Sequence, residues 1–130
     1  MIIDSSALVA ILLNEEDGVA LSAILDSEDV VRMSAASYLE TSIVIDKYRD
    51  AALSASFDDM ILDAQIIVEE VTPEQARIAR QAYRDYGKGS GHPANLNFGD
   101  CFSYALARVK REPVLFKGED FVHTDLRSAV

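Results

Sequence analysis

Four carboxylates in this sequence stand at positions that a fold could bring together: Asp4, Glu40, Asp100 and Asp120. Clustered carboxylates repel one another unless they share protons or bind cations. With no His or Cys in the pattern, an all-oxygen ligand set favours a hard ion, magnesium or manganese, over zinc. Magnesium usually takes one or two protein carboxylates and keeps waters, which leaves room for the phosphate oxygens of a substrate. One or two such ions could activate a water, so the set suggests phosphodiester hydrolysis.

Each of these acids also has an ordinary structural use. Asp4 can cap a helix through its side chain. Asp100 lies in the first turn of a predicted helix, where the macrodipole stabilises an acid by up to ~1 kcal/mol. Glu40 can be a border residue, and Asp120 can be a loop acid. A single common site is the simpler interpretation, because four independent structural roles would place acids only by coincidence at positions that an α/β fold can bring together.

The elements that must position the acids alternate between strands and helices. We expect strands at residues 1–3, 30–33, 66–71 and 113–116, and helices at 7–13, 19–25, 35–48, 50–64, 73–86 and 96–110. The clearest boundary is "TPEQ", where Thr72 caps a helix, Pro73 takes its first position and Gln75 completes a capping box. The alternation predicts one α/β domain over residues 1–130, with a mainly parallel sheet and helices on both faces. Ligands of such sheets bind beyond the carboxyl ends of the strands, at a switch in strand order.

The helix that carries Asp100 lies in "LNFGDCFSYALARVK", which begins at Leu96. Its larger apolar residues recur at helical spacing and predict a buried stripe: Phe98, Phe102, Ala105, Leu106 and Val109. Asp100 lies almost opposite that stripe, so we expect the stripe to fix the helix to the core and the carboxylate to face the shared site. Glu40 lies among apolar helical neighbours, where an ionised carboxylate needs a partner or a metal.

Length, composition and charge bound the possible functions. A chain of 130 residues with 49% hydrophobic and 26% charged residues can build a real core, which excludes a disordered or fibrous chain. The formal net charge of −10 repels phosphate-bearing partners unless a cation or a basic patch reverses it locally. The first apolar run lacks a basic flank and is interrupted by Asp4, so it predicts neither a signal peptide nor a membrane span. With a single cysteine besides, we expect a cytoplasmic protein.

One concentrated basic stripe stands out in this acidic chain. It recurs at helical spacing and comprises Arg77, Arg80, Arg84 and Lys88. With Tyr83 and Tyr86 between the cations, the stripe could hold an RNA backbone and stack its bases. Alternatively, Ala79 and the two tyrosines, together with Ala76, form a buried stripe, and the arginines are its solvated face. The sequence favours neither interpretation.

The sequence resembles PIN-domain ribonucleases, specifically the VapC-type toxins of bacterial toxin–antitoxin pairs. The resemblance rests on "MIIDSSALVAILL", on "SAASYLETSIVI", on "YGKG" followed by "HPANLNFGDCFSYALA", and on "LFKGEDFVHTDL". These segments occur in the family's order and span essentially the whole chain. The resemblance implies a three-layer α/β/α fold and a magnesium- or manganese-dependent endoribonuclease that cuts single-stranded or loop RNA. It also implies a homodimer that a cognate antitoxin holds inactive.

Carried over residue by residue, the acids of the family fall on Asp4, Glu40 and Asp100, with Ser6 supporting the site near Asp4. The fourth acid falls in "GEDF", where we place it on Asp120, although Glu119 is adjacent. The alternative function is a PIN-like module that binds RNA or protein without cleavage. Retention of all the acids argues against that alternative, because a binding module has no need of carboxylates that repel RNA.

Overall fold

The fold was analysed in a computed structural model that describes all 130 residues. The elements in chain order are β1 (Ile2–Ile3), α1 (Ser5–Leu12), α2 (Gly18–Ser27), β2 (Arg32–Ser34), α3 (Ala35–Asp46), α4 (Ala51–Asp63), β3 (Ile67–Glu69), α5 (Pro73–Tyr86), α6 (Phe98–Lys110) and β4 (Val114–Leu115). Every predicted element is present, with boundaries shifted by a few residues. None of the helices is both long and apolar enough to cross a membrane.

The four strands form one sheet in the order β3-β2-β1-β4, and every neighbouring pair is parallel. Ile2 in β1 lies opposite Arg32 on one side and Val114 on the other. From β1 the chain first builds outward through β2 to β3, and then returns to add β4 on the opposite side. The strand order therefore switches between β1 and β4, which is where an open α/β sheet binds its ligands.

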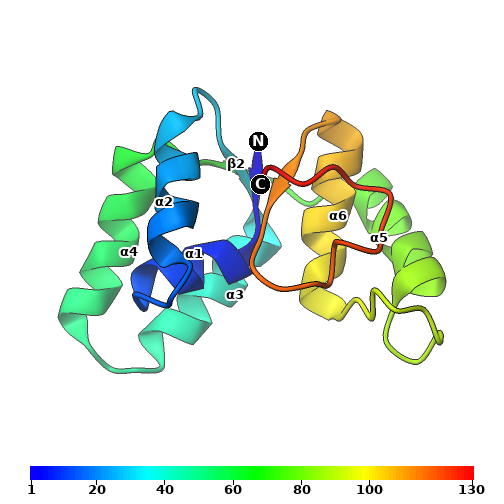
Figure 1. The fold of residues 1–130 in the computed structure, drawn as a ribbon, viewed down its shortest axis with the longest axis horizontal. Coiled ribbons are helices and arrows are strands. Elements are labelled where there is room, and N and C mark those ends of the chain that lie inside the picture. The colour runs from blue at the N-terminus through cyan, green and yellow to red at the C-terminus, as the bar shows by residue number, and fades with distance from the viewer.

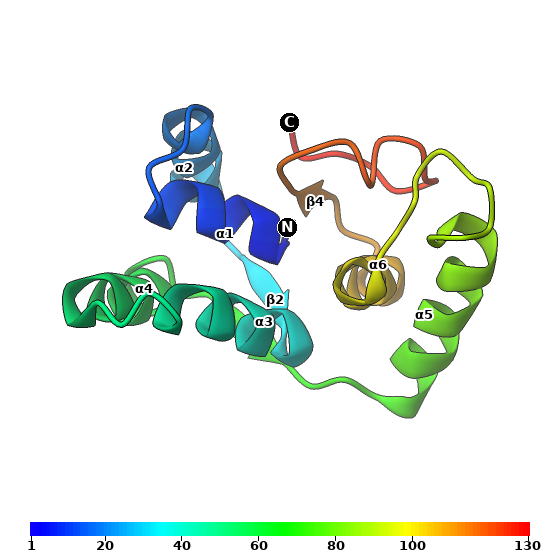
Figure 2. The ribbon, with the colours of Figure 1, turned by 90° about the horizontal axis from the view of Figure 1, so that it is seen from below.

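The sheet lies between two groups of helices, with α1 to α4 on one side and α5 and α6 on the other (Figures 1 and 2). Strand β1 contributes side chains to the hydrophobic cores on both faces of the sheet, because successive residues of a strand point to opposite faces. Ile3 packs into the core of α1 and α2, whereas Ile2 packs into the core of α5 and α6, and both are fully buried. Leu115 and Val114 divide in the same way between the two cores. The predicted three-layer fold is confirmed, and the sheet is parallel throughout.

Helix α6 buries a different face from the one predicted. Phe98 is 78% exposed, and Phe102 and Val109 are only partly buried. The buried face instead comprises Asp100, Cys101, Ser103, Tyr104, Ala105, Leu106 and Ala107. Its small residues let α6 pack closely on β1 and β2, while α5 and α3 cover its flanks. The predicted apolar stripe is confirmed at Ala105 and Leu106. It is wrong at Phe98, Phe102 and Val109, because the two phenylalanines line an open pocket between α5 and α6.

The predicted start of α5 is confirmed for its cap and wrong for its capping box. Thr72 Oγ1 accepts a hydrogen bond from the backbone N–H of Gln75, at 3.1 Å, and Pro73 occupies the first turn. The reciprocal bond from the Gln75 side chain does not form. That side chain is buried, at 5% exposure, and faces inward rather than back toward Thr72.

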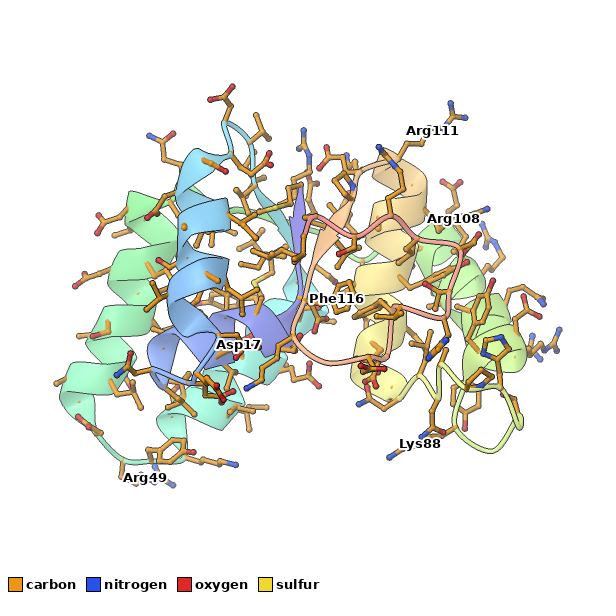
Figure 3. All side chains as sticks on the ribbon, viewed as in Figure 1. Asp17, Arg49, Lys88, Arg108, Arg111 and Phe116 are labelled. Carbon is orange, nitrogen blue, oxygen red and sulfur yellow. The ribbon has the colours of Figure 1, made fainter.

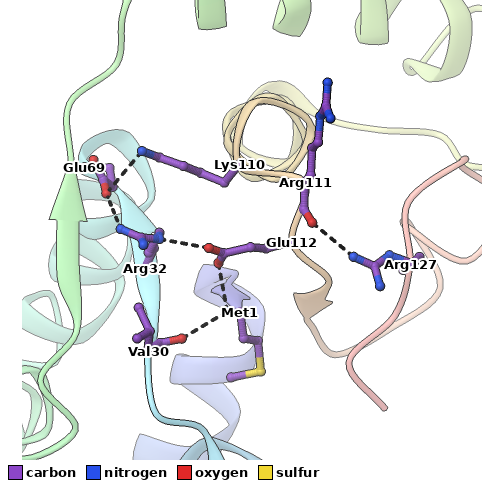
Figure 4. Close-up of polar contacts among 8 residues, drawn as sticks. All are labelled: Met1, Val30, Arg32, Glu69, Lys110, Arg111, Glu112 and Arg127. Carbon is purple, nitrogen blue, oxygen red and sulfur yellow. Dashed lines mark hydrogen bonds and ion pairs between the residues drawn. The ribbon is translucent and has the colours of Figure 1, made fainter.

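A network of ion pairs closes the amino edge of the sheet, opposite the carboxyl ends of the strands (Figure 4). Glu112 accepts from the Met1 amino group at 2.8 Å and from Arg32 Nε at 3.0 Å. Arg32 also donates to Glu69 at 2.9 Å. Although burial opposes the shift, the hydrogen bonds from Met1 and Arg32 hold the pKa of Glu112 below its usual range. The network ties together the starts of β1 and β2 and the turn before β4.

We expect Glu112→Gln to lower the free energy of unfolding by about 1 kcal/mol at pH 7, because it weakens two charge-assisted bonds at a partly exposed site. A carboxyl with a lowered pKa stabilises the fold above its unfolded pKa and loses that contribution as the pH falls. Urea unfolding at pH 7 and pH 3 measures both effects. A difference that stays the same at pH 3 would show that the charge of Glu112 contributes nothing.

Candidate active site

A pocket of about 480 Å³ at the carboxyl edge of the sheet is lined by all four predicted acids. It lies where β1 runs into α1 and where α6 begins. Asp120 lines this pocket, whereas the adjacent Glu119 is exposed and does not. The geometry therefore favours Asp120 as the fourth acid. Ser6, the predicted supporting residue, lines the same pocket.

Asp4 is held rigidly between the sheet and α6. Its side chain is 2% exposed and caps α1 by accepting from the backbone N–H of Ser6 at 3.0 Å. Its other oxygen accepts from Ser103 Oγ at 2.5 Å, and Ser103 in turn lies 3.2 Å from Ser37 Oγ. The capping role of Asp4 is therefore confirmed, and it is compatible with a role in the site, which stays a prediction. Neither Ser103 nor Ser37 was predicted from the sequence to belong to the site. The only available signal was that Ser103 lies one turn after Asp100.

Glu40 reaches the site from α3 and touches both α1 and α6. Its Oε1 accepts from Ser5 Oγ at 2.5 Å. A Cβ built on Gly99 would overlap the Glu40 carboxylate, so Gly99 leaves the space that this carboxylate occupies against the first turn of α6. The chain thus brings Glu40 beside the residue that precedes Asp100. The partner that an ionised Glu40 was predicted to need is therefore Ser5, which no sequence pattern pointed to.

Gly99→Ala tests whether that close approach matters. We expect the new methyl to push the Glu40 carboxylate out of place and to lower cleavage by about 10-fold or more, since small displacements of catalytic groups have effects of this size. The free energy of unfolding should stay the same or rise by up to ~1 kcal/mol, because alanine is the better helix former. Initial cleavage rates and urea unfolding of the same preparation separate the two effects. Wild-type activity in this variant would show that Glu40 need not occupy its observed position.

Asp100 closes a capping box at the start of α6. Its backbone N–H donates to Asn97 Oδ1 at 2.9 Å, and its Oδ2 accepts from the Asn97 N–H at 3.0 Å. Burial raises the pKa of Asp100 from 3.8 to about 8, against the hydrogen bond from Asn97, which lowers it. Hydrogen bonding to Asp120 and the charges of Asp4 and Asp120 raise this pKa further. Without a cation the carboxyl is therefore held largely protonated at neutral pH.

Lys117 is the pocket's one cationic side chain, and it is already paired. Its ammonium contacts Glu15 and lies 3.2 Å from Asp17 Oδ1, in the turn between α1 and α2. Its backbone N–H donates to Ser6 Oγ at 3.0 Å, which fastens the segment after β4 to the start of α1. Because Lys117 is engaged by these acids, it does not offset the charge of the four carboxylates. The sequence analysis did not assign Lys117 or Glu15 to the site.

The donor set fits a hard divalent cation bound partly through water. No three His, Cys, Asp or Glu side chains are grouped closely enough to hold a metal ion as they stand. Asp4, Glu40 and Asp100 are each turned toward a serine or a backbone N–H instead. Magnesium needs only one or two carboxylates directly, so a closed cluster is not required. The proton that Asp100 retains is one that a cation would replace.

The three arginines of the predicted basic stripe lie on α5, whereas Lys88 lies in the loop after it, and the four cations divide between two directions. Arg80 and Lys88 line a second pocket between α5 and α6, whereas Arg77 and Arg84 are exposed and do not line it. Tyr83 lines that pocket and is 47% exposed. The buried stripe of α5 comprises Gln75, Ala79 and Ala82. The alternative interpretation, with Ala76 and Tyr83 buried, is therefore wrong for those two residues. RNA contact by the stripe stays a prediction.

Fold and site together define a class: a single α/β/α domain with an acidic pocket at the switch point of a parallel sheet. A family model described as PIN domain matches residues 1–126. The chain therefore belongs to the PIN domain family. It is 55% identical over 130 residues to Ribonuclease VapC28 of Mycobacterium tuberculosis, covering 100% of this chain and 98% of that relative. It is 49% identical over 129 residues to Ribonuclease VapC42 of the same species, covering 99% and 98%. The resemblance to VapC-type proteins is confirmed.

Solved structures show the same fold at low sequence identity. The crystal structure of Mycobacterium tuberculosis VapC20, a sarcin-ricin loop cleaving toxin, superposes with a TM-score of 0.74 at 20% identity, covering 96% of this chain and 95% of that chain. FitAcB from Neisseria gonorrhoeae superposes with a TM-score of 0.71 at 18% identity, covering 98% and 94%. Both likenesses extend over nearly the whole chain, so they support the three-layer fold.

Proposed function

We propose that this protein is a metal-dependent endoribonuclease that acts in the cytoplasm as the toxin of a toxin–antitoxin pair. The observation that carries the proposal is that four carboxylates from distant parts of the chain line one pocket at the switch point of the sheet. The most similar relatives described above are named ribonucleases, which supports the same activity here. Magnesium and manganese are the cofactors that an all-oxygen donor set favours.

In this proposal the two most buried acids, Asp4 and Asp100, are the direct metal ligands, at 2% and 8% exposure. Glu40 and Asp120 are more exposed, and they complete the site through water. A divalent ion bound there would polarise the scissile phosphate and lower the pKa of the attacking water. Glu40 or Asp120 accepts the proton of that water, because both can exchange protons with solvent. Ser103 and Ser6 fix the orientation of Asp4, and Ser5 fixes that of Glu40.

Cleavage of a single-stranded RNA by the purified protein tests the proposal. We expect manganese or magnesium to switch cleavage on and excess EDTA to stop it. The matched control is Asp100→Asn, purified in parallel, because a contaminating nuclease would survive that substitution. A pure protein that binds RNA with manganese present and never cuts it would contradict the proposal and favour a non-cleaving module.

We further propose that a cognate antitoxin and a second copy of this chain are partners. An antitoxin with a basic side chain would be attracted to the pocket, because Lys117 is paired with Glu15 and Asp17 and leaves the charge of the pocket's other carboxylates unbalanced. Co-expression with the product of a neighbouring small gene tests the first partner, and light scattering of the purified chain tests the second. Failure to copurify, or a monomer at all concentrations, would contradict the respective part.

A further inference from the structure

A second pocket lies beside the acidic one, between α5 and α6, and its walls are aromatic. It has a volume of about 600 Å³, within the range of small-molecule sites. Three rings line it: those of Tyr83, Phe98 and Phe102. Ala79 and Cys101 line it as well. No other part of the chain covers these aromatic side chains, so the pocket is open to a ligand.

The rings are held in place while remaining open to solvent. Tyr83 donates from its hydroxyl to the backbone oxygen of Lys88 at 2.9 Å, which fixes its ring across the end of α5. Phe98 stands edge-on to Phe102, with ring centroids 4.9 Å apart and planes at 84°. Phe98 nevertheless keeps 78% of its surface exposed. Flat, fixed and exposed aromatic faces suit the stacking of another flat ring.

Two unpaired cations stand at this pocket. Arg80 and Lys88 line it, and neither forms a salt bridge, although the chain carries a net charge of −10. Lys88 projects outward near the end of the molecule where α6 begins (Figure 3). In an acidic protein, free cations around an apolar pocket complement a ligand that joins an apolar ring to a negative charge. A nucleotide within an RNA strand has that combination.

The two pockets share one lining residue at the start of α6. Asn97 lines both of them, and its side chain and backbone form the capping box with Asp100. A ligand that occupies the aromatic pocket therefore lies next to the acids. The same helix start orients Asp100 on one side and presents Phe98 on the other.

We propose that the aromatic pocket takes an unpaired base of the RNA substrate, next to the phosphate that lies at the acids. The inference rests on the proposed function. Tyr83, Phe98 and Phe102 supply the stacking surface, and Arg80 and Lys88 neutralise the flanking phosphates. Stacking of this kind tolerates every base, because each base has a π face. The pocket thus fixes the position of the strand relative to the acids, and requires that the nucleotide be unpaired.

A binding experiment that needs no cleavage tests the pocket. The probe is an eight-nucleotide uridine oligomer that carries 2-aminopurine at one position, mixed with protein in excess EDTA at low salt. We expect quenching of the 2-aminopurine fluorescence by the wild-type protein. Phe98→Ala should remove most of the quenching and weaken binding by about 10-fold, in line with the loss of one stacked base. Because Phe98 is exposed, this variant should fold normally, which a thermal melt checks.

Matched variants control for the loss of any exposed ring or charge. Tyr48→Ala removes a ring that is 53% exposed and lies after α3, so it should leave quenching and affinity unchanged. Lys88→Ala should weaken binding and reduce its dependence on salt, whereas Lys47→Ala should do neither. Equal quenching by wild type and Phe98→Ala would overturn the inference. So would a Phe98→Ala protein that binds RNA normally but changes its oligomeric mass, because the pocket would then hold a second copy.

Cleavage, assayed separately with manganese, distinguishes failure of this inference from failure of the proposed function. If the protein cuts RNA but does not quench the probe, the proposed nuclease function stands and the base-pocket inference fails. If the protein quenches the probe through Phe98 but never cuts RNA, the base-pocket inference stands and the proposed nuclease function fails.

Discussion

Asp100→Asn should lower RNA cleavage by about 100-fold or more, and should also make the metal-free protein more stable. The first effect follows because the substitution removes a proposed metal ligand at the centre of the acidic pocket. The second follows from burial, which raises the pKa of Asp100 to about 8. The amide oxygen of asparagine can still accept the Asn97 N–H, so the capping box is retained. Loss of activity would then come with a gain in stability, which a folding defect cannot produce.

The pH dependence of that gain has a definite sign. Between pH 3.8 and about 8, the folded protein keeps a proton on Asp100 that the unfolded chain releases. Stability therefore falls as the pH rises through this window. Asparagine has no such proton, so the variant should match wild type below pH 3.8 and exceed it increasingly up to pH 8. Melting temperatures in EDTA at pH 5 and pH 8 measure the growing difference.

Glu119→Gln is the matched control for this experiment. It removes an equal charge from an exposed acid in the segment that carries Asp120, outside the pocket. We expect wild-type cleavage and an unchanged melting temperature. If Asp100→Asn cleaves as fast as wild type, Asp100 has no place in the reaction. If instead the Asp100→Asn protein melts at a lower temperature than wild type at pH 8, the buried carboxyl stabilises the fold and the predicted gain in stability is wrong.

The alternation of strands and helices in the sequence was enough to predict a mainly parallel sheet with helices on both faces, and the edge of the sheet that bears the site. Strands and helices alternate clearly, and Asp4 follows a short apolar run that is typical of a buried strand. The position of Asp4 at the carboxyl edge then follows from topology alone. The start of α5 was similarly predictable from Thr72 and Pro73, because capping depends on neighbouring residues.

The contacts that hold the site together could not be predicted, because they join distant segments. Ser103 meets Asp4 across 99 residues, and Ser5 meets Glu40 across 35. The exposed face of α6 was mispredicted because its phenylalanines dominate the hydrophobic pattern, whereas smaller residues meet the sheet. The capping box of Asn97 and Asp100 was readable from their spacing, since an acid three residues after an asparagine favours a helix start. The carboxylate of Asp100 therefore has both a structural role in this capping box and a proposed catalytic role.

Cleavage at a fixed, subsaturating magnesium concentration should rise by about 10-fold per pH unit up to about pH 8. The proton and the cation compete for Asp100, so each unit below its pKa removes about 90% of the ionised form that the metal needs. Initial rates from pH 6 to pH 9 at two magnesium concentrations measure this competition.

The magnesium dependence of the midpoint separates competition at Asp100 from simple deprotonation of the attacking water. If magnesium displaces the proton from Asp100, each tenfold increase in magnesium above its dissociation constant for the ionised site moves the midpoint of the profile down by about one pH unit, because the metal stabilises the ionised carboxylate. Metal binding should also raise the melting temperature more at pH 8 than at pH 6, since proton release no longer opposes it. Deprotonation of a water on an already saturated site gives a midpoint that more magnesium cannot move. A fixed midpoint would therefore show that the metal does not replace a proton on the buried carboxyl.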